Sequence, residues 1–406
     1  MNYNPQILLL LFLISIYNNF AHAKSKSIDT NKTKLPIVSY KSSDLSISLS
    51  AGVLGDYTYF DQDSISMAQV GAEDSQFDLR AARFALYGNF KLFDEEFKYL
   101  LSCGFSDYLT RDAKTLCNLF NATILYDIPE DRGRISIGKM KEPWSYEMVG
   151  DSVALPQSER FLKPFFQSRN IGIQYSNQYL DKHGTYTVGI FNDWLDEDIS
   201  FADNSQQFTA RVTLLPYISD DHMNYIHLAI SSRYNIQNSS TLRYKGQPES
   251  NVANIFVDTG AMDADSAIES GVEFLWSHDG VSILGEYLQS NVSSRSLDNP
   301  KFDGWYILGS WILSGDGRPY DQKLGYAREI IPKTDQGAIE LMARYSRLDL
   351  DDDMVHGGEM EKWTVGINWW KDAYWKLSMN YGRVNLDRFG MQGRSDIALF
   401  RIQWVR

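Results

Sequence analysis

The stretch ELMARYSRLDLDDD, residues 340–353, separates into two faces when alternate residues are read together. One face is apolar and consists of Leu341, Ala343 and Tyr345. The other face is mostly polar and consists of Glu340, Met342, Arg344 and Ser346. Alternation with a period of two predicts a β-strand that has one face in an apolar environment. The aspartates that follow, from 349 to 353, predict a solvated segment where the strand ends.

The same alternation recurs along most of the chain. In residues 45–59 it continues for about fifteen residues, which exceeds the roughly five or six residues of a typical soluble strand. Further alternating segments are 171–176, 208–214, 226–233, 363–369, 375–381 and 398–404. Some segments, such as GWYILGSWIL (304–313), are apolar on both faces. Helical periodicity is scarce, so the pattern predicts an all-β chain of long strands.

Composition excludes two classes of protein, and two architectures with long amphipathic strands then remain. Charged residues make up 22% of the 406 residues and aromatic residues 14%, so the chain is neither a helical membrane protein nor disordered. A secreted all-β binding protein would hide its apolar faces between two sheets and use shorter strands. An outer-membrane barrel turns its apolar faces to lipid and its polar faces to a lumen.

Aromatic residues near the strand ends favour the barrel, because membrane barrels carry aromatic girdles at both interfaces. These residues are Tyr57, Tyr59, Trp363, Trp369, Trp370, Trp375, Tyr381 and Trp404. The polar face of the alternating segments is small and suits water better than a packed core. We therefore predict a transmembrane antiparallel β-barrel of about 16 strands around an aqueous channel.

The N-terminus predicts export. ILLLLFLISI (7–16) is an apolar run of signal-peptide length, and AHA (21–23) is a small-x-small cleavage site. We expect residues 1–23 to be a cleaved signal peptide, 24–43 a flexible lead, and 44–406 the barrel domain. An exported chain also meets an oxidising compartment, so Cys103 and Cys117, which would face each other in a hairpin centred near residue 110, are candidates for a disulfide. Two unlinked thiols are the alternative.

Several segments resemble the phosphate-selective porin O and P family, and together they cover nearly all of the mature chain. The C-terminal segments are AIELMARYSRLDL (338–350), EKWTVGINWW (361–370) and LSMNYGRVNLD (377–387). The earlier segments are FDLRAARFALYGNF (77–90), ISIGKMKEPWSYE (135–147), ERFLKPFFQSRNIGIQY (159–175) and SWILSGDGRPYD (310–321). The two central segments resemble the strand, inward-folding loop and return strand of the family.

The resemblance implies a homotrimeric outer-membrane barrel that passes small anions, phosphate above all, through a lumen lined by arginine and lysine. Outer-membrane lipid and lipopolysaccharide would surround it. Independently of the resemblance, a second hypothesis for the aspartate block at 349–353, beside a solvated loop, is divalent-cation bridging to anionic lipid headgroups. Two features depart from the family. Barrels of this kind usually end in an aromatic residue, whereas this chain ends in Arg406, and its formal net charge is −13.

Arginines on the polar face are the candidates for pore selectivity, because fixed charge at a narrow point favours ions of one sign and the guanidinium fork suits phosphate. The alternation of inward and outward residues places five of them in the lumen: Arg83, Arg211, Arg233, Arg344 and Arg401. The segment that matches the constriction loop adds Arg160, Lys163 and Arg169. Arg80 falls on the opposite face in this alternation, so it is expected at the rim or before the strand proper.

A structural role is the alternative for each arginine, because lumen arginines often pair with lumen carboxylates across strands. Glu273, Glu286 and Glu340 are available for such pairs, and Glu340 lies on the same face as Arg344. SGDGRP (314–319) is expected to be a simple turn, because it lacks the spacing of a calcium loop or of a phosphate-binding loop.

The motif search predicts no enzyme, metal, cofactor or nucleic-acid partner. Histidines are scattered without metal-ligand spacing, and nucleophile and phosphate-loop motifs are missing from the sequence. The predicted function is passive diffusion of small hydrophilic solutes across the outer membrane, with a preference for anions such as phosphate. The alternatives are a general or cation-leaning porin, and a non-conducting structural or adhesive barrel.

Overall fold

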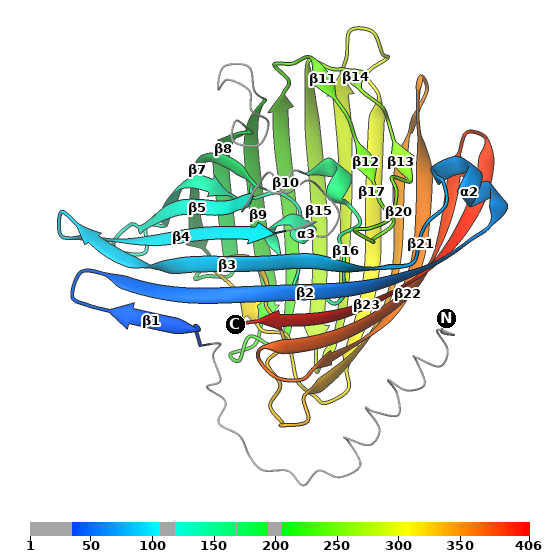
Figure 1. Cartoon of the computed structure of the whole chain (residues 1–406). Coiled ribbons are helices and arrows are strands. Elements are labelled where there is room, and N and C mark those ends of the chain that lie inside the picture. The colour runs from blue at the N-terminus through cyan, green and yellow to red at the C-terminus, as the bar shows by residue number, and fades with distance from the viewer. Residues whose placement is uncertain (1–34, 106–117, 167–168, 194–204) are drawn as a thin grey trace.

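Strands make up almost all of the structure. The computed structural model (Figure 1) describes residues 35–105, 118–166, 169–193 and 205–406. The strands of the main sheet are β1 (Val38–Lys41), β2 (Ser46–Gln62), β3 (Gln76–Leu92), β4 (Glu95–Phe105), β5 (Asn118–Asp127), β6 (Arg134–Met140), β7 (Asn170–Tyr179), β8 (Gly184–Asn192), β9 (Gln206–Ile218), β10 (Tyr225–Ile236), β15 (Ser266–His278), β16 (Val281–Ser293), β17 (Lys301–Ile312), β20 (Ala338–Asp352), β21 (Val355–Trp370), β22 (Trp375–Arg388) and β23 (Met391–Val405).

The short elements lie in the connections between these strands. They are α2 (Ser64–Val70), α3 (Tyr146–Val149), the 3-10 helix η1 (Lys163–Phe165), β11 (Thr241–Leu242), β12 (Lys245–Gly246), β13 (Val257–Asp258), β14 (Met262–Asp263), β18 (Tyr320–Asp321) and β19 (Tyr326–Ala327). Among the described residues, no helix is long and apolar enough to cross a membrane.

Sixteen strands close into an antiparallel barrel, as the sequence predicts. Each strand pairs with its neighbours in chain order, and β2 closes the barrel by pairing with both β3 and β23. The opening stretch occupies β20, where Leu308 of β17 lies opposite Arg344, and Arg344 opposite Thr364 of β21. Among the strands that the structure describes, β1 pairs with β2 alone. The predicted lead, 24–43, therefore ends in an ordered strand, because residues 38–41 hydrogen-bond along the start of β2.

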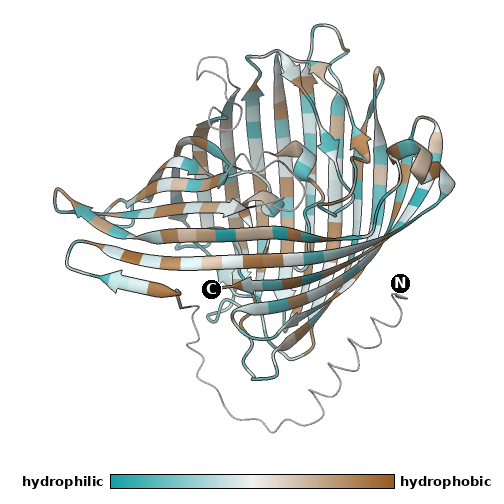
Figure 2. Cartoon of the chain, in the orientation of Figure 1, coloured by the Kyte–Doolittle hydropathy of each residue, from teal (hydrophilic) through white to brown (hydrophobic). Residues whose placement is uncertain are grey.

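The two faces of the strands differ in exposure as the alternation predicts. In β20, Glu340, Met342, Arg344 and Ser346 are buried inside the barrel, whereas Leu341 points outward and is 38% exposed. Outward apolar residues form a band around the wall, and alternating colours along the strands show the same pattern (Figure 2). Members of the band include Val53, Ile173, Ile190, Ile230, Val272, Ile307, Val365 and Ile402. This surface is suited to lipid acyl chains.

Aromatic side chains also gather on the outer face. The rings of Tyr345 and Trp363 lie 4.5 Å apart, and those of Trp375 and Trp404 lie 6.4 Å apart. Trp370 does not belong to this surface, although the sequence suggested it for the girdle. It is 3% exposed, and its indole N–H donates to Glu340 inside the barrel.

The two ends of the barrel differ in their connections. The end at which β2 begins and β23 ends, here called the turn end, has tight connections such as 93–94 and 279–280. The opposite end, here called the loop end, carries longer connections that include 63–75, 141–169 and 237–265. One connection at the turn end is also long, because residues 313–337 separate β17 from β20.

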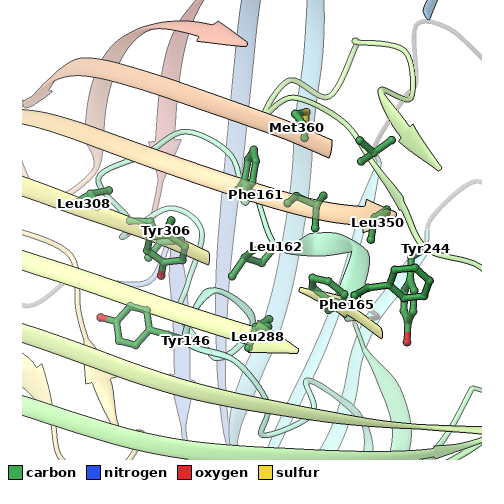
Figure 3. Packing of buried hydrophobic residues seen from close by; sticks show 14 of the residues in the cluster. Tyr146, Phe161, Leu162, Phe165, Tyr244, Leu288, Tyr306, Leu308, Leu350 and Met360 are labelled. Carbon is green, nitrogen blue, oxygen red and sulfur yellow. The ribbon is translucent and has the colours of Figure 1, made fainter. Parts of the chain in front are cut away.

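One side of the lumen is a packed hydrophobic core. Figure 3 shows Phe161, Leu162 and Phe165 among side chains such as Leu288 and Tyr306 of the barrel wall. All five residues are at most 2% exposed. The prediction of a small and polar lumen face was therefore wrong on this side. The core also explains why 304–313 is apolar on both faces, since one face of β17 meets lipid and the other meets this core.

Candidate functional site

Residues 141–166, which follow β6, fold into the barrel (Figure 1), and we call these residues, together with Arg169 just before β7, the inward loop. Trp144, Phe161 and Leu162 are fully buried and fix the loop against the wall. Gly304 of β17 allows this approach, because a Cβ atom there would lie 2.8 Å from Leu162. The loop therefore narrows the lumen, as the resemblance implies.

Two wall arginines hold the inward loop through its carboxylates. Arg233 of β10 donates from Nε to Glu142 at 2.8 Å and from Nη1 to Glu269 of β15 at 2.7 Å. Arg344 of β20 lies 2.9 Å from Glu147 and is 1% exposed. Removing either arginine would leave a buried carboxylate unpaired, which is costly. Both arginines therefore anchor the loop.

Glu147 also organises the loop from within. Its Oε2 atom accepts hydrogen bonds from the backbone N–H groups of Phe161 and Leu162, both at 3.0 Å. Glu286 of β16 accepts from the N–H of Tyr146 at 2.7 Å, at the start of α3. These bonds satisfy buried donors that the irregular backbone would otherwise leave without partners.

A third anchor joins β3 and β23 to the inward loop. Arg401 donates to Asp56 and to Glu159 at 2.6 and 2.5 Å, and Arg80 donates from Nε to Glu159 at 2.5 Å. The expectation that Arg80 lies at the rim or before the strand proper was wrong, because Arg80 lies within β3 and contacts Glu159 inside the barrel. The pairing between β2 and β3 shifts register between Leu54 and Asp56. Such a bulge changes the face on which later side chains emerge.

The pairing of Arg344 with Glu340, considered as the structural alternative, does not form. Glu340 instead pairs with Arg318 at 2.7 Å, and it accepts a hydrogen bond from Asn368. The second carboxylate beside Arg344 is Glu249, at 3.3 Å. The alternation correctly placed Arg344 and Glu340 on the inner face, but their partners come from connections that are distant in the sequence.

Two further connections fold into the lumen from opposite ends. We call residues 237–265 the loop-end segment and residues 313–337 the turn-end segment. In the loop-end segment, Gln247 accepts from Lys163 at 2.5 Å and Glu249 pairs with Lys362 at 2.9 Å. In the turn-end segment, Arg318 donates to the carbonyl oxygen of Ala154. The simple turn expected at 314–319 is thus the start of a folded segment.

The turn-end segment also engages Arg211, the remaining buried wall arginine of the predicted set. Arg211 donates from Nη2 to Glu273 at 2.6 Å and to the carbonyl oxygen of Gly325 at 2.9 Å. Its side chain is 4% exposed. Like the other buried wall arginines, Arg211 is held by a carboxylate.

Two contiguous cavities lie along the inner side of β2, β3 and β5. The first has a volume of about 460 Å³ and reaches Lys245 and Gln247 toward the loop end. The second, of about 330 Å³, reaches Ser50 and Val405 toward the turn end. Both share a middle section, lined by Arg80, Arg83, Phe120, Asp151, Ser152, Val153, Glu159 and Arg169. We call the two cavities together the basic passage.

Charge in the basic passage is strongly positive. Seven cationic side chains line its first cavity: Arg80, Arg83, Lys141, Arg160, Lys163, Arg169 and Lys245. Two acidic side chains, Asp151 and Glu159, line the same cavity, and Glu159 is already paired with Arg80 and Arg401. The guanidinium groups of Arg83 and Arg169 lie 4.3 and 5.2 Å from the ring centre of Phe120.

The lysines of the inward loop have pKa values near the neutral range. Burial lowers the pKa of Lys141 to about 7, although Asp151 opposes this effect. Burial likewise lowers the pKa of Lys163 to about 8. Desolvation inside the barrel would by itself raise the pKa of Asp151, but Lys141 and Arg328 outweigh this effect and lower the pKa to about 2. Asp151 is therefore ionised at neutral pH.

Comparison with known families identifies this barrel. The family model described as phosphate-selective porin O and P matches residues 49–404, which is nearly the whole chain. The chain belongs to the phosphate-selective porin O and P family. The resemblance seen in the sequence is thus confirmed. Family and fold together support an outer-membrane porin channel.

The porin also has a relative of partial length. An uncharacterized protein of Caulobacter vibrioides is 24% identical over 255 residues, which is 59% of this chain. The chain spans about half the length of that relative, because the match covers 51% of it.

Solved structures with the same fold are outer-membrane proteins. An anion-selective porin from Comamonas acidovorans has a TM-score of 0.60 at 11% identity, over 89% of this chain and 99% of that one. OmpT of Vibrio cholerae has a TM-score of 0.56 at 8% identity, over 89% and 97% of the two chains. The channel DcaP of Acinetobacter baumannii has a TM-score of 0.55 at 12% identity, over 91% and 100%.

The residues predicted for the porin's pore divide into two groups. Arg211, Arg233, Arg344 and Arg401 point into the barrel but are at most 4% exposed and held by carboxylates. Arg83, Arg160, Lys163 and Arg169 line the basic passage. Sequence reasoning missed Lys141, Lys245 and Asp151 as passage residues, because each lies in a connection whose direction the alternation does not specify.

Two other expectations concern the cysteines and metal ions. The pairing of Cys103 with Cys117 stays a prediction, because Cys117 lies outside the described residues. In the part of the chain that the structure describes, no group of three or more histidine, cysteine and acidic residues is arranged to hold a metal ion.

Proposed function

We propose that this porin passes small hydrophilic anions, phosphate among them, by passive diffusion through the basic passage. The observation that carries the proposal is the segregation of charge on the inward loop. Its carboxylates Glu142, Glu147 and Glu159 are held by wall arginines, whereas Arg160, Lys163 and Arg169 line the open cavity. A narrow passage with low-dielectric walls concentrates the field of the cations that line it.

The lining also suits phosphate chemically. Guanidinium groups offer paired N–H donors that match the oxygens of a tetrahedral anion, and lysine adds mobile donors. Arg83 and Arg160 each keep a buried Nε atom without a hydrogen-bond partner in the protein. An anion in the passage would satisfy such donors.

A general or cation-leaning porin is the second candidate, favoured by the net charge of −13. Much of this negative charge lies away from the passage, as at Asp351, Asp352 and Asp353, where β20 ends and β21 begins. Selectivity depends on charge at the narrow section more than on the total, so the basic passage supports the first candidate. The proposal includes no enzymatic activity.

Planar-bilayer recording of charge variants tests the proposal. Replacing Arg160 and Arg169 together with alanine is expected to shift the reversal potential in a KCl gradient toward cation preference. The matched control is Arg383→Ala, because Arg383 pairs with Asp396 on the exterior and is 48% exposed. An unchanged reversal potential in the Arg160 and Arg169 variant would reject the basic passage as the selectivity filter.

Export and assembly are part of the same proposal. We propose that residues 1–23 are removed on export, that the barrel assembles as a homotrimer, and that outer-membrane lipid and lipopolysaccharide surround it. N-terminal sequencing of the purified outer-membrane protein should begin at Lys24. Native mass spectrometry in detergent should show three copies, and a monomer under mild detergent would contradict the assembly.

A further inference from the structure

The turn-end segment is unusually long for its position, because barrels of this class have short turns at one end and long loops at the other. It contains the hairpin of β18 and β19, and it folds into the lumen to meet the inward loop. Tyr146 of the inward loop accepts a hydrogen bond at its hydroxyl oxygen from the N–H of Ala327, at 3.2 Å. The two segments therefore meet inside the barrel, one from each end.

Asp151 lies where these segments meet. Its Oδ2 atom accepts a hydrogen bond from the Tyr326 hydroxyl at 3.1 Å and lies 3.5 Å from Nη1 of Arg328. Its Oδ1 atom lies 3.3 Å from Nζ of Lys141. Arg328 also donates to the Tyr326 hydroxyl at 2.6 Å. The turn-end segment thus holds one carboxylate of the inward loop in a fixed position.

Asp151 is also accessible to solutes in the passage. Its side chain is 41% exposed, and it lines both cavities in the section that they share. The other acid of that section, Glu159, is 8% exposed and paired with two arginines. Asp151 is therefore the accessible negative charge among the described side chains of this section, and it faces Arg83, Arg160 and Arg169.

A fixed negative charge among cations has a specific physical effect on multivalent anions. Conduction requires that an ion bind strongly enough to enter and weakly enough to leave. An unopposed cluster of guanidinium groups would hold a divalent anion for a long time, and more strongly than a monovalent one, because the attraction scales with the charge of the ion. A neighbouring carboxylate repels the divalent anion about twice as strongly as chloride.

We propose that Asp151, held by Tyr326 and Arg328 of the turn-end segment, is a specificity-determining residue that weakens divalent-anion binding in the basic passage and so speeds the release of hydrogen phosphate. The inference rests on the proposed anion preference and adds to it a residue that limits affinity. It also assigns a role to the turn-end segment, which fixes the carboxylate beside the cations.

Block of chloride current by added phosphate measures this binding directly. In the wild-type porin, phosphate should reduce the chloride current with a measurable half-blocking concentration at a pH near 8, where hydrogen phosphate dominates. Asp151→Asn keeps the size and the hydrogen-bond acceptor but removes the charge. We expect it to lower the half-blocking concentration by about fivefold to tenfold. Current carried by phosphate alone should fall, because release becomes slower.

The variant Tyr326→Phe distinguishes the effect of the Asp151 charge from the effect of the contact that anchors Asp151. It removes the hydrogen bond to Asp151 but leaves the carboxylate charge in the passage, so the half-blocking concentration should stay within about twofold of the wild-type value. If Tyr326→Phe reproduces the full effect of Asp151→Asn, the role of Asp151 is structural and the inference is overturned. An unchanged half-blocking concentration in Asp151→Asn overturns it as well.

The failure of the proposed function would look different. A wild-type porin that prefers cations would contradict the anion passage itself, whatever the variants do. A wild-type porin that prefers anions, with no response to Asp151→Asn, would contradict only the role of Asp151.

Discussion

At the scale of single residues, Arg344 shows that a side chain inside the barrel need not line the open passage. The sequence placed it on the water-facing side of its strand, and the structure places it inside the barrel. It is nevertheless buried beside Glu147, Glu249 and the ring of Tyr306, whose centre lies 3.9 Å from the guanidinium carbon. Its partners come from two inward segments, which a reading of one strand cannot identify.

Replacing Arg344 with methionine should therefore destabilise the barrel. Loss of the cation leaves the buried Glu147 without its ion-pair partner and Glu249 with Lys362 alone, and removing one partner of a buried pair costs about 3–5 kcal/mol. Urea unfolding in detergent, followed by tryptophan fluorescence, measures the free energy of unfolding. The control Arg383→Ala breaks an exposed pair and should change this free energy little. Equal stability of the Arg344 variant and the wild type would contradict the anchoring role.

The lysines of the inward loop predict a pH-dependent selectivity. Their pKa values of about 7 for Lys141 and about 8 for Lys163 lie below the usual lysine value, so both are charged at lower pH and neutral at higher pH. Asp151 stays ionised, so raising the pH removes only positive charge. The ratio of anion to cation permeability should fall by roughly half between about pH 6 and about pH 9.

The matched variant for this effect carries arginine at both lysine positions. Arginine stays protonated throughout this range, so reversal potentials of the double variant Lys141→Arg and Lys163→Arg should change little with pH. A pH response equal to that of the wild type would assign the titration to other groups.

At the scale of elements, the inward loop behaves as a folded unit inside the barrel. Glu147 is its central support, because it accepts two backbone hydrogen bonds and pairs with Arg344. Glu147→Ala should loosen the loop, raise single-channel conductance and reduce ion selectivity. Glu130→Ala is the control, since Glu130 lies in a turn and is 81% exposed. Unaltered conductance in the Glu147 variant would show that the loop does not depend on this residue.

The outward orientation of a strand residue predicts the free-energy cost of placing a charge there. Ile307 lies near the middle of β17, points outward and is 52% exposed. Ile307→Arg should cost about 2–4 kcal/mol in the free energy of folding into a bilayer, the cost of arginine near the membrane midplane. Met354→Arg is the control, because Met354 lies in a connection at the loop end and is 60% exposed. A similar, small cost for both variants would contradict a lipid-facing position of Ile307.

Elements differ in how far the sequence predicts them. The long strands follow from alternation, because a strand with one face in lipid and one in the lumen needs a period of two. The direction of a connection has no such signal, since an inward and an outward segment both contain polar and turn-forming residues. The inward course of 313–337 was therefore missed. Arg80 was misplaced for a related reason, because a bulge shifts the period by one residue.

At the scale of the whole molecule, the lumen is divided into a packed side and an open side. Three connections fill the packed side with apolar residues and paired charges, and the basic passage runs along the inner face of β2, β3 and β5. A net charge of −13 is compatible with an anion-selective pore under this division, because the passage keeps its own excess of cations. Ion selectivity is therefore a property of the passage.

The zero-current potential of the wild-type porin in a KCl gradient tests this account most directly. The porin, purified from outer membranes and inserted in a neutral planar bilayer, should show a potential of the sign that chloride selectivity requires. Potassium phosphate in place of KCl should give the same sign. A potential of the opposite sign, showing cation preference, would contradict the central claim that the basic passage carries the ions.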